Sequence, residues 1–384
     1  MKKHLKKYSL LFKDAFLSSL FCLFFTFILS LIVLNLSFLN PFKEAFKDFS
    51  FSDLYYAEKI QETSINKDII LISIEKRDRT EIALLLESIL LENPKIVGID
   101  AIFKDLKDTE GDINLAEVLN DKKIISAINI EEKGIIKNHP FFDTKNEGFI
   151  NINFDGSNKV IRTFDAFQKS DSSFTLKIAS KFGEKIDTKK LRKNQRIKYT
   201  GNYKSFIHFG FDEFMISSNK NIVKNKIVLL GYLGTPIGSP FDVEDKFFTP
   251  LNKTTSGKSL PDMFGVVVHA NILKMFLEND FIYEVSNFWV YLITYLFVFL
   301  FMVFQLKLER KGEIYNRTLK WLVIFLFTVI LLYIHLLLYS KDIYLNVFYI
   351  IAITAVCSNL FIFYVHFIKF LNTKIKWKSY ILQK

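Results

Sequence analysis

Residues 68–100 read DIILISIEKRDRTEIALLLESILLENPKIVGID and predict a β-α-β unit. The β-branched run Asp68–Ile74 predicts a buried strand. Apolar residues at helical spacing predict a helix over Asp78–Glu92. Its first residue forms a capping box with a Glu three positions on, and an Asn-Pro pair ends it. Ile96–Asp100 predicts a second strand, so the unit favours a parallel sheet covered by helices.

The same alternation continues along the chain. A short helix at Leu115–Leu119 and a strand at Lys123–Ile128 extend the order to β-α-β-α-β. Later helices are expected at Ser173–Phe182 and Gly265–Leu277, with a strand at Ile227–Leu230 between them. These patterns predict an α/β domain with three layers around a mostly parallel sheet.

A hairpin is expected to be inserted in this alternation. Gly148–Asn153 and Val160–Phe164 bracket Asp155-Gly156, a pair that tolerates the positive φ of a tight turn. Loops are expected at Thr109–Asn114, Asn138–Glu147 and Phe241–Leu260.

Four long stretches contain no Asp, Glu, Lys or Arg, namely residues 15–39, 288–306, 321–339 and 343–368. Each is long enough to cross a bilayer as a helix. The first has a basic start but a long apolar region and no A-x-A site after it, so it predicts an uncleaved signal anchor. The two cysteines, Cys22 and Cys357, lie inside spans, so no disulfide is expected in the domain between them.

Charge predicts the orientation of these spans. Residues 41–287 hold 35 basic and 36 acidic residues, whereas the rest of the chain holds 16 basic and 4 acidic residues. Of those 16, 15 fall in the segments 1–14, 307–320 and 369–384, which the positive-inside rule makes cytoplasmic. Residues 40–287 are then the extracytoplasmic domain. A basic excess divided in this way predicts contact with the lipid bilayer and no nucleic-acid partner.

No catalytic signature is complete. Ser256-Gly257-Lys258-Ser259 resembles the end of a P-loop, but Asn252 stands where its first glycine should be. The six histidines show no metal-ligand spacing, and no cofactor is expected. These patterns predict a protein that is not an enzyme, with no catalytic residues and no metal site.

Several polar residues and glycines follow predicted strands, at the edge where open α/β sheets bind ligands. They suggest a ligand-binding cleft formed by Asp100, Gly231, Gly234, Asp242, Asp245 and His269. The alternative is a set of caps, turns and buried hydrogen bonds that hold loops in place.

Three other polar residues stand out. Arg162 is expected to pair with a nearby carboxylate. His335 and His366 lie inside the third and fourth spans, within about a turn of a span end, so they are expected to reach the membrane interface.

The order of motifs in the external block resembles the type-2 CHASE domain, a sensory module of bacterial membrane receptors. The matching pieces are Ile70–Glu75, Val97–Phe103, Gly148–Arg162, Ile227–Gly234, Asp242–Leu251 and Gly265–Leu273. The resemblance implies a multi-pass receptor of the bacterial cytoplasmic (inner) membrane. Its domain would be periplasmic or extracellular, and both termini cytoplasmic.

The chain departs from the family's pattern in two places. Only residues 369–384 follow the last span where relatives carry a kinase or cyclase, so we expect a separate signalling partner, with a homo-oligomer left open. Ser73 stands where an acidic residue is expected. The sequence favours a sensor or signalling subunit. A structural scaffold of an envelope or transport complex is the alternative, and an external hydrolase is the least favoured function.

Overall fold

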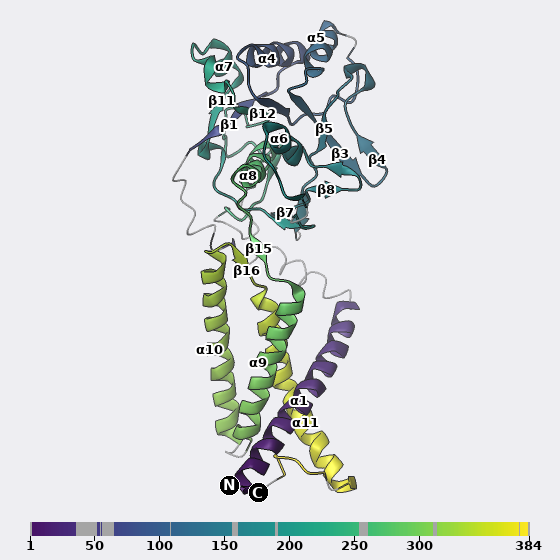
Figure 1. Ribbon diagram of the computed structural model, residues 1–384, viewed down its shortest axis with the longest axis vertical. Coiled ribbons are helices and arrows are strands. Elements are labelled where there is room, and N and C mark those ends of the chain that lie inside the picture. The colour runs from purple at the N-terminus through teal and green to yellow at the C-terminus, as the bar shows by residue number, and fades with distance from the viewer. Residues whose placement is uncertain are drawn as a thin grey trace. The chain divides into compact units, whose positions relative to one another are not determined.

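The structure is a computed structural model that describes residues 2–35, 52–53, 55, 65–107, 109–155, 160–188, 191–252, 260–309, 313–375 and 377–382. The chain divides into two compact units. One comprises Glu44–Ile282, and the other combines Met1–Lys43 with Tyr283–Lys384. Figure 1 shows the elements of both.

A seven-stranded mixed sheet forms the centre of the Glu44–Ile282 unit. Its order is β11-β1-β12-β2-β3-β4, and β5 also pairs with β3. All pairs are parallel except β3–β4. The strands are β1 (Asn66–Ser73), β2 (Ile96–Ile99), β3 (Ile124–Glu131), β4 (Gly134–Ile136), β5 (Glu147–Phe149), β11 (Phe206–Phe209) and β12 (Ile227–Gly231).

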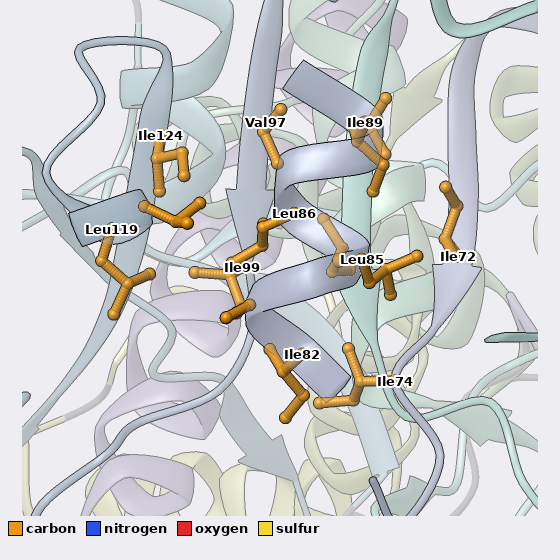
Figure 2. Packing of buried hydrophobic residues seen from close by; sticks show 14 of the residues in the cluster. Ile72, Ile74, Ile82, Leu85, Leu86, Ile89, Val97, Ile99, Leu119 and Ile124 are labelled. Atoms are coloured by element: carbon orange, nitrogen blue, oxygen red, sulfur yellow. The ribbon is translucent and has the colours of Figure 1, made fainter. Parts of the chain in front are cut away.

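The main core lies between this sheet and helix α4 (Arg79–Leu91). The apolar side chains that define its helical spacing are buried, as Figure 2 shows for Ile82, Leu85, Leu86 and Ile89. The capping box is confirmed, because Glu81 N donates to Asp78 Oδ1 (2.9 Å) and Asp78 N donates to Glu81 Oε2 (3.1 Å). Local signals therefore place this helix correctly.

Two other helices pack closely against the sheet at glycine residues of its strands. A Cβ at Gly98 of β2 would lie 2.6 Å from Ile178 Cδ1 of α6 (Phe174–Phe182). A Cβ at Gly231 of β12 would lie 2.6 Å from Val266 Cβ of α8 (Gly265–Glu278). Close packing at these positions leaves no room for a methyl group.

Some elements differ from the expectations. Helix α5 (Glu110–Leu119) begins where a loop was expected at Thr109–Asn114, because Asp112 in its first turn is buried against Arg79. Strand β6 (Asn153–Asp155), and not Gly148–Asn153, pairs antiparallel with β7 (Val160–Phe164). Residues 156–159 lie outside the described residues, so the inserted hairpin stays a prediction. The three-layer arrangement also stays a prediction.

The remaining elements are short. They are α7 (Phe211–Ile216), the 3-10 helices η2 (Pro140–Phe142), η4 (Tyr203–Ser205) and η5 (Lys220–Val223), and the strands β8 (Phe167–Gln168), β9 (Asp171–Ser172), β10 (Gln195–Arg196), β13 (Lys246–Phe247) and β14 (Met263–Phe264). Strand β10 joins β7 and β6 in a separate three-stranded sheet of order β10-β7-β6.

Among the described residues of the second unit, four helices are long and apolar enough to cross a membrane. They are α1 (Lys2–Asn35), α9 (Asn287–Leu308), α10 (Glu313–Tyr339) and α11 (Val347–Ile375). Helices α1, α9 and α11 pack on one another. Polar contacts join them, including Gln305 Nε2 to Ser358 Oγ (2.8 Å) and Thr26 Oγ1 to Cys357 Sγ (3.3 Å).

A short parallel strand pair also belongs to this unit. Strand β15 (Tyr283–Glu284) pairs with β16 (Ile343–Tyr344), so α11 begins at Val347 rather than at residue 343. His335 does not reach outward as expected but is buried, with Nδ1 2.9 Å from the carbonyl oxygen of Leu345. His366 is exposed on α11.

Candidate functional site

The carboxyl ends of three adjacent strands lie side by side in the sheet. Their pairing places Ser73 of β1 beside Gly231 of β12, and Asp100 directly follows β2. The backbone remains hydrogen-bonded past the strand ends, since Ile74 N donates to Gly231 O (3.0 Å) and Asp100 N donates to Leu230 O (2.8 Å). This is the edge at which open α/β sheets bind ligands.

Two predicted site residues face each other at this edge. His269 Nε2 of α8 lies 4.0 Å from Asp100 Oδ2, and both side chains are less than one-tenth exposed. The ring of His269 also meets that of Phe174 edge-on, at 5.7 Å between centroids. The sheet edge and α8 therefore enclose an acid–imidazole pair.

Asp245 is the third member of this group. A Cβ at Gly265 would lie 3.0 and 3.2 Å from its two carboxylate oxygens, so the carboxylate sits against the start of α8. Burial and the negative charge of Asp100 raise the pKa of Asp245. We call Asp100, Asp245 and His269 the acid–histidine cluster.

The protonation of this cluster follows from its surroundings. Burial raises the pKa of Asp100, because a buried carboxylate loses the hydration of its charged form. Burial lowers the pKa of His269 to about 4, so its imidazole is neutral at neutral pH and gives no counter-charge. Because their pKa values are raised, Asp100 and Asp245 exchange protons at a pH closer to neutral than ordinary carboxylates do. Among the described residues, no group of three or more His, Cys, Asp or Glu side chains is arranged to hold a metal ion.

Asp242 has a different environment. Its carboxylate accepts hydrogen bonds from Tyr232 Oη, Thr235 N (3.1 Å) and Glu244 N (3.1 Å), all within its own stretch of chain. The Tyr232 hydrogen bond is the main reason that the pKa of Asp242 is lowered. These contacts are those of a residue that orders a loop.

The two predicted glycines serve close packing. Gly231 lets the end of β12 approach Val266, as described above. Gly234 has φ +88°, and a Cβ there would lie 2.9 Å from Phe264 Cζ. Both positions demand glycine for steric reasons.

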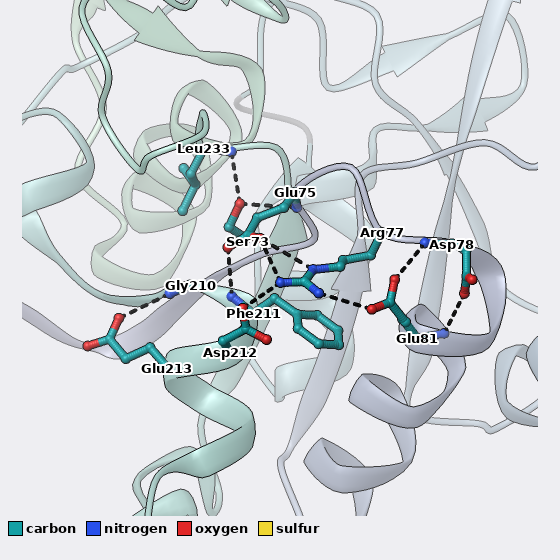
Figure 3. Close-up of polar contacts among 10 residues, drawn as sticks. All are labelled: Ser73, Glu75, Arg77, Asp78, Glu81, Gly210, Phe211, Asp212, Glu213 and Leu233. Atoms are coloured by element: carbon teal, nitrogen blue, oxygen red, sulfur yellow. Dashed lines mark hydrogen bonds and ion pairs between the residues drawn. The ribbon is translucent and has the colours of Figure 1, made fainter.

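A second polar network at the same edge was not predicted (Figure 3). Arg77 pairs with Glu75 (3.3 Å), Glu81 (3.0 Å) and Asp212 (2.5 Å), and its guanidinium lies 4.3 Å from the ring centre of Phe211. Glu75 also accepts from Phe211 N (3.2 Å), so the network joins the end of β1 to α4 and α7. The charged Glu-Lys-Arg run directly after a buried strand is the sequence signal that could have identified it.

Ser73, which stands where an acidic residue was expected, belongs to this edge. Its hydroxyl accepts from Glu75 N and Leu233 N, both at 3.3 Å, and so joins the ends of β1 and β12. Arg162 pairs with a carboxylate as predicted. Its guanidinium donates through Nε and Nη2 to Asp53 (3.1 and 2.7 Å), with both side chains buried.

A family model described as the CHASE2 domain matches residues 26–304. No curated protein and no solved structure matches the chain.

Proposed function

We propose, because this chain belongs to the CHASE2 domain family of sensory modules, that it is a membrane sensor or signalling subunit without catalytic activity. In this proposal, residues 40–287 lie outside the cytoplasm of a bacterium and both termini lie inside. A ligand or a state of the envelope would change the domain, and the spans would pass the change to a separate partner. The four long apolar helices and the basic segments beside them support this topology.

The observation that carries the proposal is the segment leaving the domain, Asp280–Val285, which we call the exit segment. Within the domain unit, Lys198 Nζ contacts both carboxylate oxygens of Asp280 (2.8 and 2.7 Å). Gln195 Nε2 donates to the carbonyl of Ile282 (3.1 Å). Gln195 belongs to β10 and Lys198 lies two residues after it, so these contacts fix the exit segment to the three-stranded sheet.

The next residues are fixed within the other unit. Tyr283 N donates to Asp342 O (2.7 Å) and Val285 N donates to Tyr344 O (2.9 Å). These bonds join the exit segment to the connection between α10 and α11, immediately before α9 begins. The chain is hydrogen-bonded on both sides of the Ile282–Tyr283 peptide bond. In this proposal a displacement at α8 would pass along the chain to α9 and, through the β15–β16 pairing, to α10 and α11.

The chain entering the domain is held by the same small sheet. Asp53 pairs with Arg162 of β7, and β7 pairs with β10, which supplies Gln195. A two-state change of the domain that moves this sheet would therefore move both the entering and the leaving chain. A stimulus can drive such a change only by the difference between its affinities for the two states.

The proposal is tested by isolating the full chain in mild detergent and identifying its stoichiometric partners with and without mutation of the exit segment. We expect a kinase- or cyclase-containing partner, whose activity changes when Gln195→Ala and Lys198→Met release the exit segment. A constitutive complex with envelope proteins, unchanged by these substitutions, would contradict sensing and favour a scaffold.

A further inference from the structure

A cavity of about 360 Å³ lies along one side of α6, away from the residues of the acid–histidine cluster. Its lining includes Lys145, Asn146, Ser172, Lys177, Ser180 and Lys181. The volume equals that of about twelve water molecules and falls in the range of small-molecule sites. Lysine, amide and hydroxyl groups are all able to donate hydrogen bonds to an anion.

Two of these lysines are held in place on one helix face. Lys177 and Lys181 stand four residues apart on α6, a spacing at which like charges repel. Lys177 Nζ donates to the carbonyl of Glu147, and Lys181 Nζ donates to that of Lys122 (3.1 Å). Each ammonium has three donors, so both keep N–H groups for another acceptor.

The lysines that line the cavity, Lys145, Lys177 and Lys181, have no counter-ion within ion-pair distance in the part of the chain that the structure describes. Burial and the charge of Lys177 lower the pKa of Lys181, as expected for a cation without a counter-ion. Glu147, beside Lys145 in sequence, directs its carboxylate to Thr144 Oγ1.

We propose that this cavity binds a small oxyanion, a carboxylate or a phosphate group. The anion would lie between the ammonium groups of Lys145, Lys177 and Lys181 and accept hydrogen bonds from Ser172 or Ser180. Leu176 and Phe167 give the cavity an apolar side, which suits an organic anion with a short carbon skeleton.

The position of the cavity connects it to the exit segment. Helix α6 packs against α8, where Phe174 meets His269, and α8 ends two residues before Asp280 of the exit segment. An anion that draws the lysines together would displace α6, and α6 would in turn displace α8. The inference that the anion is the stimulus of the sensor rests on the proposed function. The inference that the cavity binds an anion does not.

Binding is tested by calorimetry on the detergent-solubilised full chain at constant ionic strength, with inorganic phosphate, citrate and chloride as probes. The test variant is Lys145→Gln/Lys181→Gln. The matched control is Lys133→Gln/Lys137→Gln, which removes two exposed charges near β4. A third variant, Lys181→Arg, keeps the charge, and circular dichroism checks that each variant is folded.

We expect saturable binding of phosphate or citrate that weakens at least ten-fold in the test variant and less than two-fold in the control and in Lys181→Arg. Preference for phosphate or for citrate identifies which oxyanion the cavity recognises. No binding by the unmodified protein, or equal loss in test and control variants, would overturn the proposal. Binding that leaves hydrogen exchange of the exit segment unchanged would contradict the anion as stimulus and leave the site standing.

Discussion

The backbone N–H of Tyr283 donates a 2.7 Å hydrogen bond to the carbonyl of Asp342. This bond begins the parallel pairing of β15 with β16, in which Tyr283 is opposite Ile343 and Glu284 is opposite Tyr344. Residues that leave the sensory domain are thereby tied to the turn between two later spans. Such a tie can convey a displacement only if it persists in the membrane-embedded protein.

Engineered cysteines test this register. The pair Tyr283→Cys/Ile343→Cys should form a disulfide on mild oxidation of the full chain in vesicles, because directly paired residues lie within disulfide reach. Tyr283→Cys/Tyr344→Cys is the control, since a shift of one residue directs the side chains to opposite faces. The native cysteines are first changed to Ser, and non-reducing mass analysis measures the product. Equal yields from the two pairs would show that the register is wrong.

The buried ion pair of Arg162 with Asp53 should matter far more than an exposed pair. Arg162→Met removes the guanidinium that pairs with the buried Asp53 carboxylate, so we expect a loss of about 3–5 kcal/mol in the free energy of unfolding. Denaturant titration followed by far-ultraviolet circular dichroism measures this loss. Arg162→Met/Asp53→Leu should recover most of it.

Lys226→Met supplies the control for this comparison. Lys226 pairs with Asp68 at 2.6 Å, but both side chains are substantially exposed, so the expected loss is about 0–1 kcal/mol. A similar cost for Arg162→Met and Lys226→Met would show that the Arg162 contact does not hold the entering chain.

Replacing Asp100 by Asn should change the pH dependence of stability. Burial raises the pKa of Asp100 to about 7 from its ordinary 3.8, so the folded state binds more protons than the unfolded state between these values. The free energy of unfolding therefore falls as pH rises through this window. Asp100→Asn should raise the thermal midpoint at pH 8 and change it little at pH 4. About 1 kcal/mol corresponds to a shift of about 2–4 °C.

His269 has the opposite sign. Its folded pKa of about 4 lies below the ordinary 6.5, so its contribution to stability increases as pH rises between these values. Measurements from pH 6.5 to 8 therefore separate the effect of the two carboxylates, Asp100 and Asp245, from that of His269. Asp242→Asn is the control, because the pKa of Asp242 is lowered and its effect should be constant over that range. A constant effect of Asp100→Asn as well would contradict the acid–histidine cluster.

Close packing predicts the effect of a single methyl group at Gly231. Its Cβ would lie 2.6 Å from Val266 Cβ, so Gly231→Ala should cost about 1–3 kcal/mol. Gly231→Ala/Val266→Ala should cost less than the sum of the two single changes, because the second change removes Val266 Cγ2 and Cγ1, which would lie 2.9 and 3.2 Å from the added methyl group. Strict additivity in denaturant titrations would show that β12 and α8 do not approach so closely.

Local signals predicted much of this fold. Helix α4 was identified by its capping box and apolar spacing, which require only neighbouring residues. Strand β11 was missed because Phe206–Phe209 is short and its partner β1 is distant in sequence. The early start of α5 and the late start of α11 depend on the Arg79–Asp112 contact and on the β15–β16 pairing, which no local pattern reveals.

The candidate site was predicted in part for the same reason. Strand-end position placed Asp100 at this edge of the sheet, and the structure brings two other predicted residues, Asp245 and His269, close to it. Asp242 follows a strand too, but its nearest donors order its own loop. The α6 lysines gave no signal, because lysines four residues apart on a short helix are typical of a solvated surface.

The central claim is that the three-stranded sheet holds the exit segment and so couples the domain to the spans. Hydrogen exchange of the Tyr283 and Val285 amides in Gln195→Ala/Lys198→Met tests it most directly, with Lys133→Gln as control. We predict exchange at least several-fold faster in the double variant and unchanged in the control, because loss of each contact weakens the segment by about 1 kcal/mol. Faster exchange in β10 with unchanged exchange at Tyr283 and Val285 would contradict the coupling.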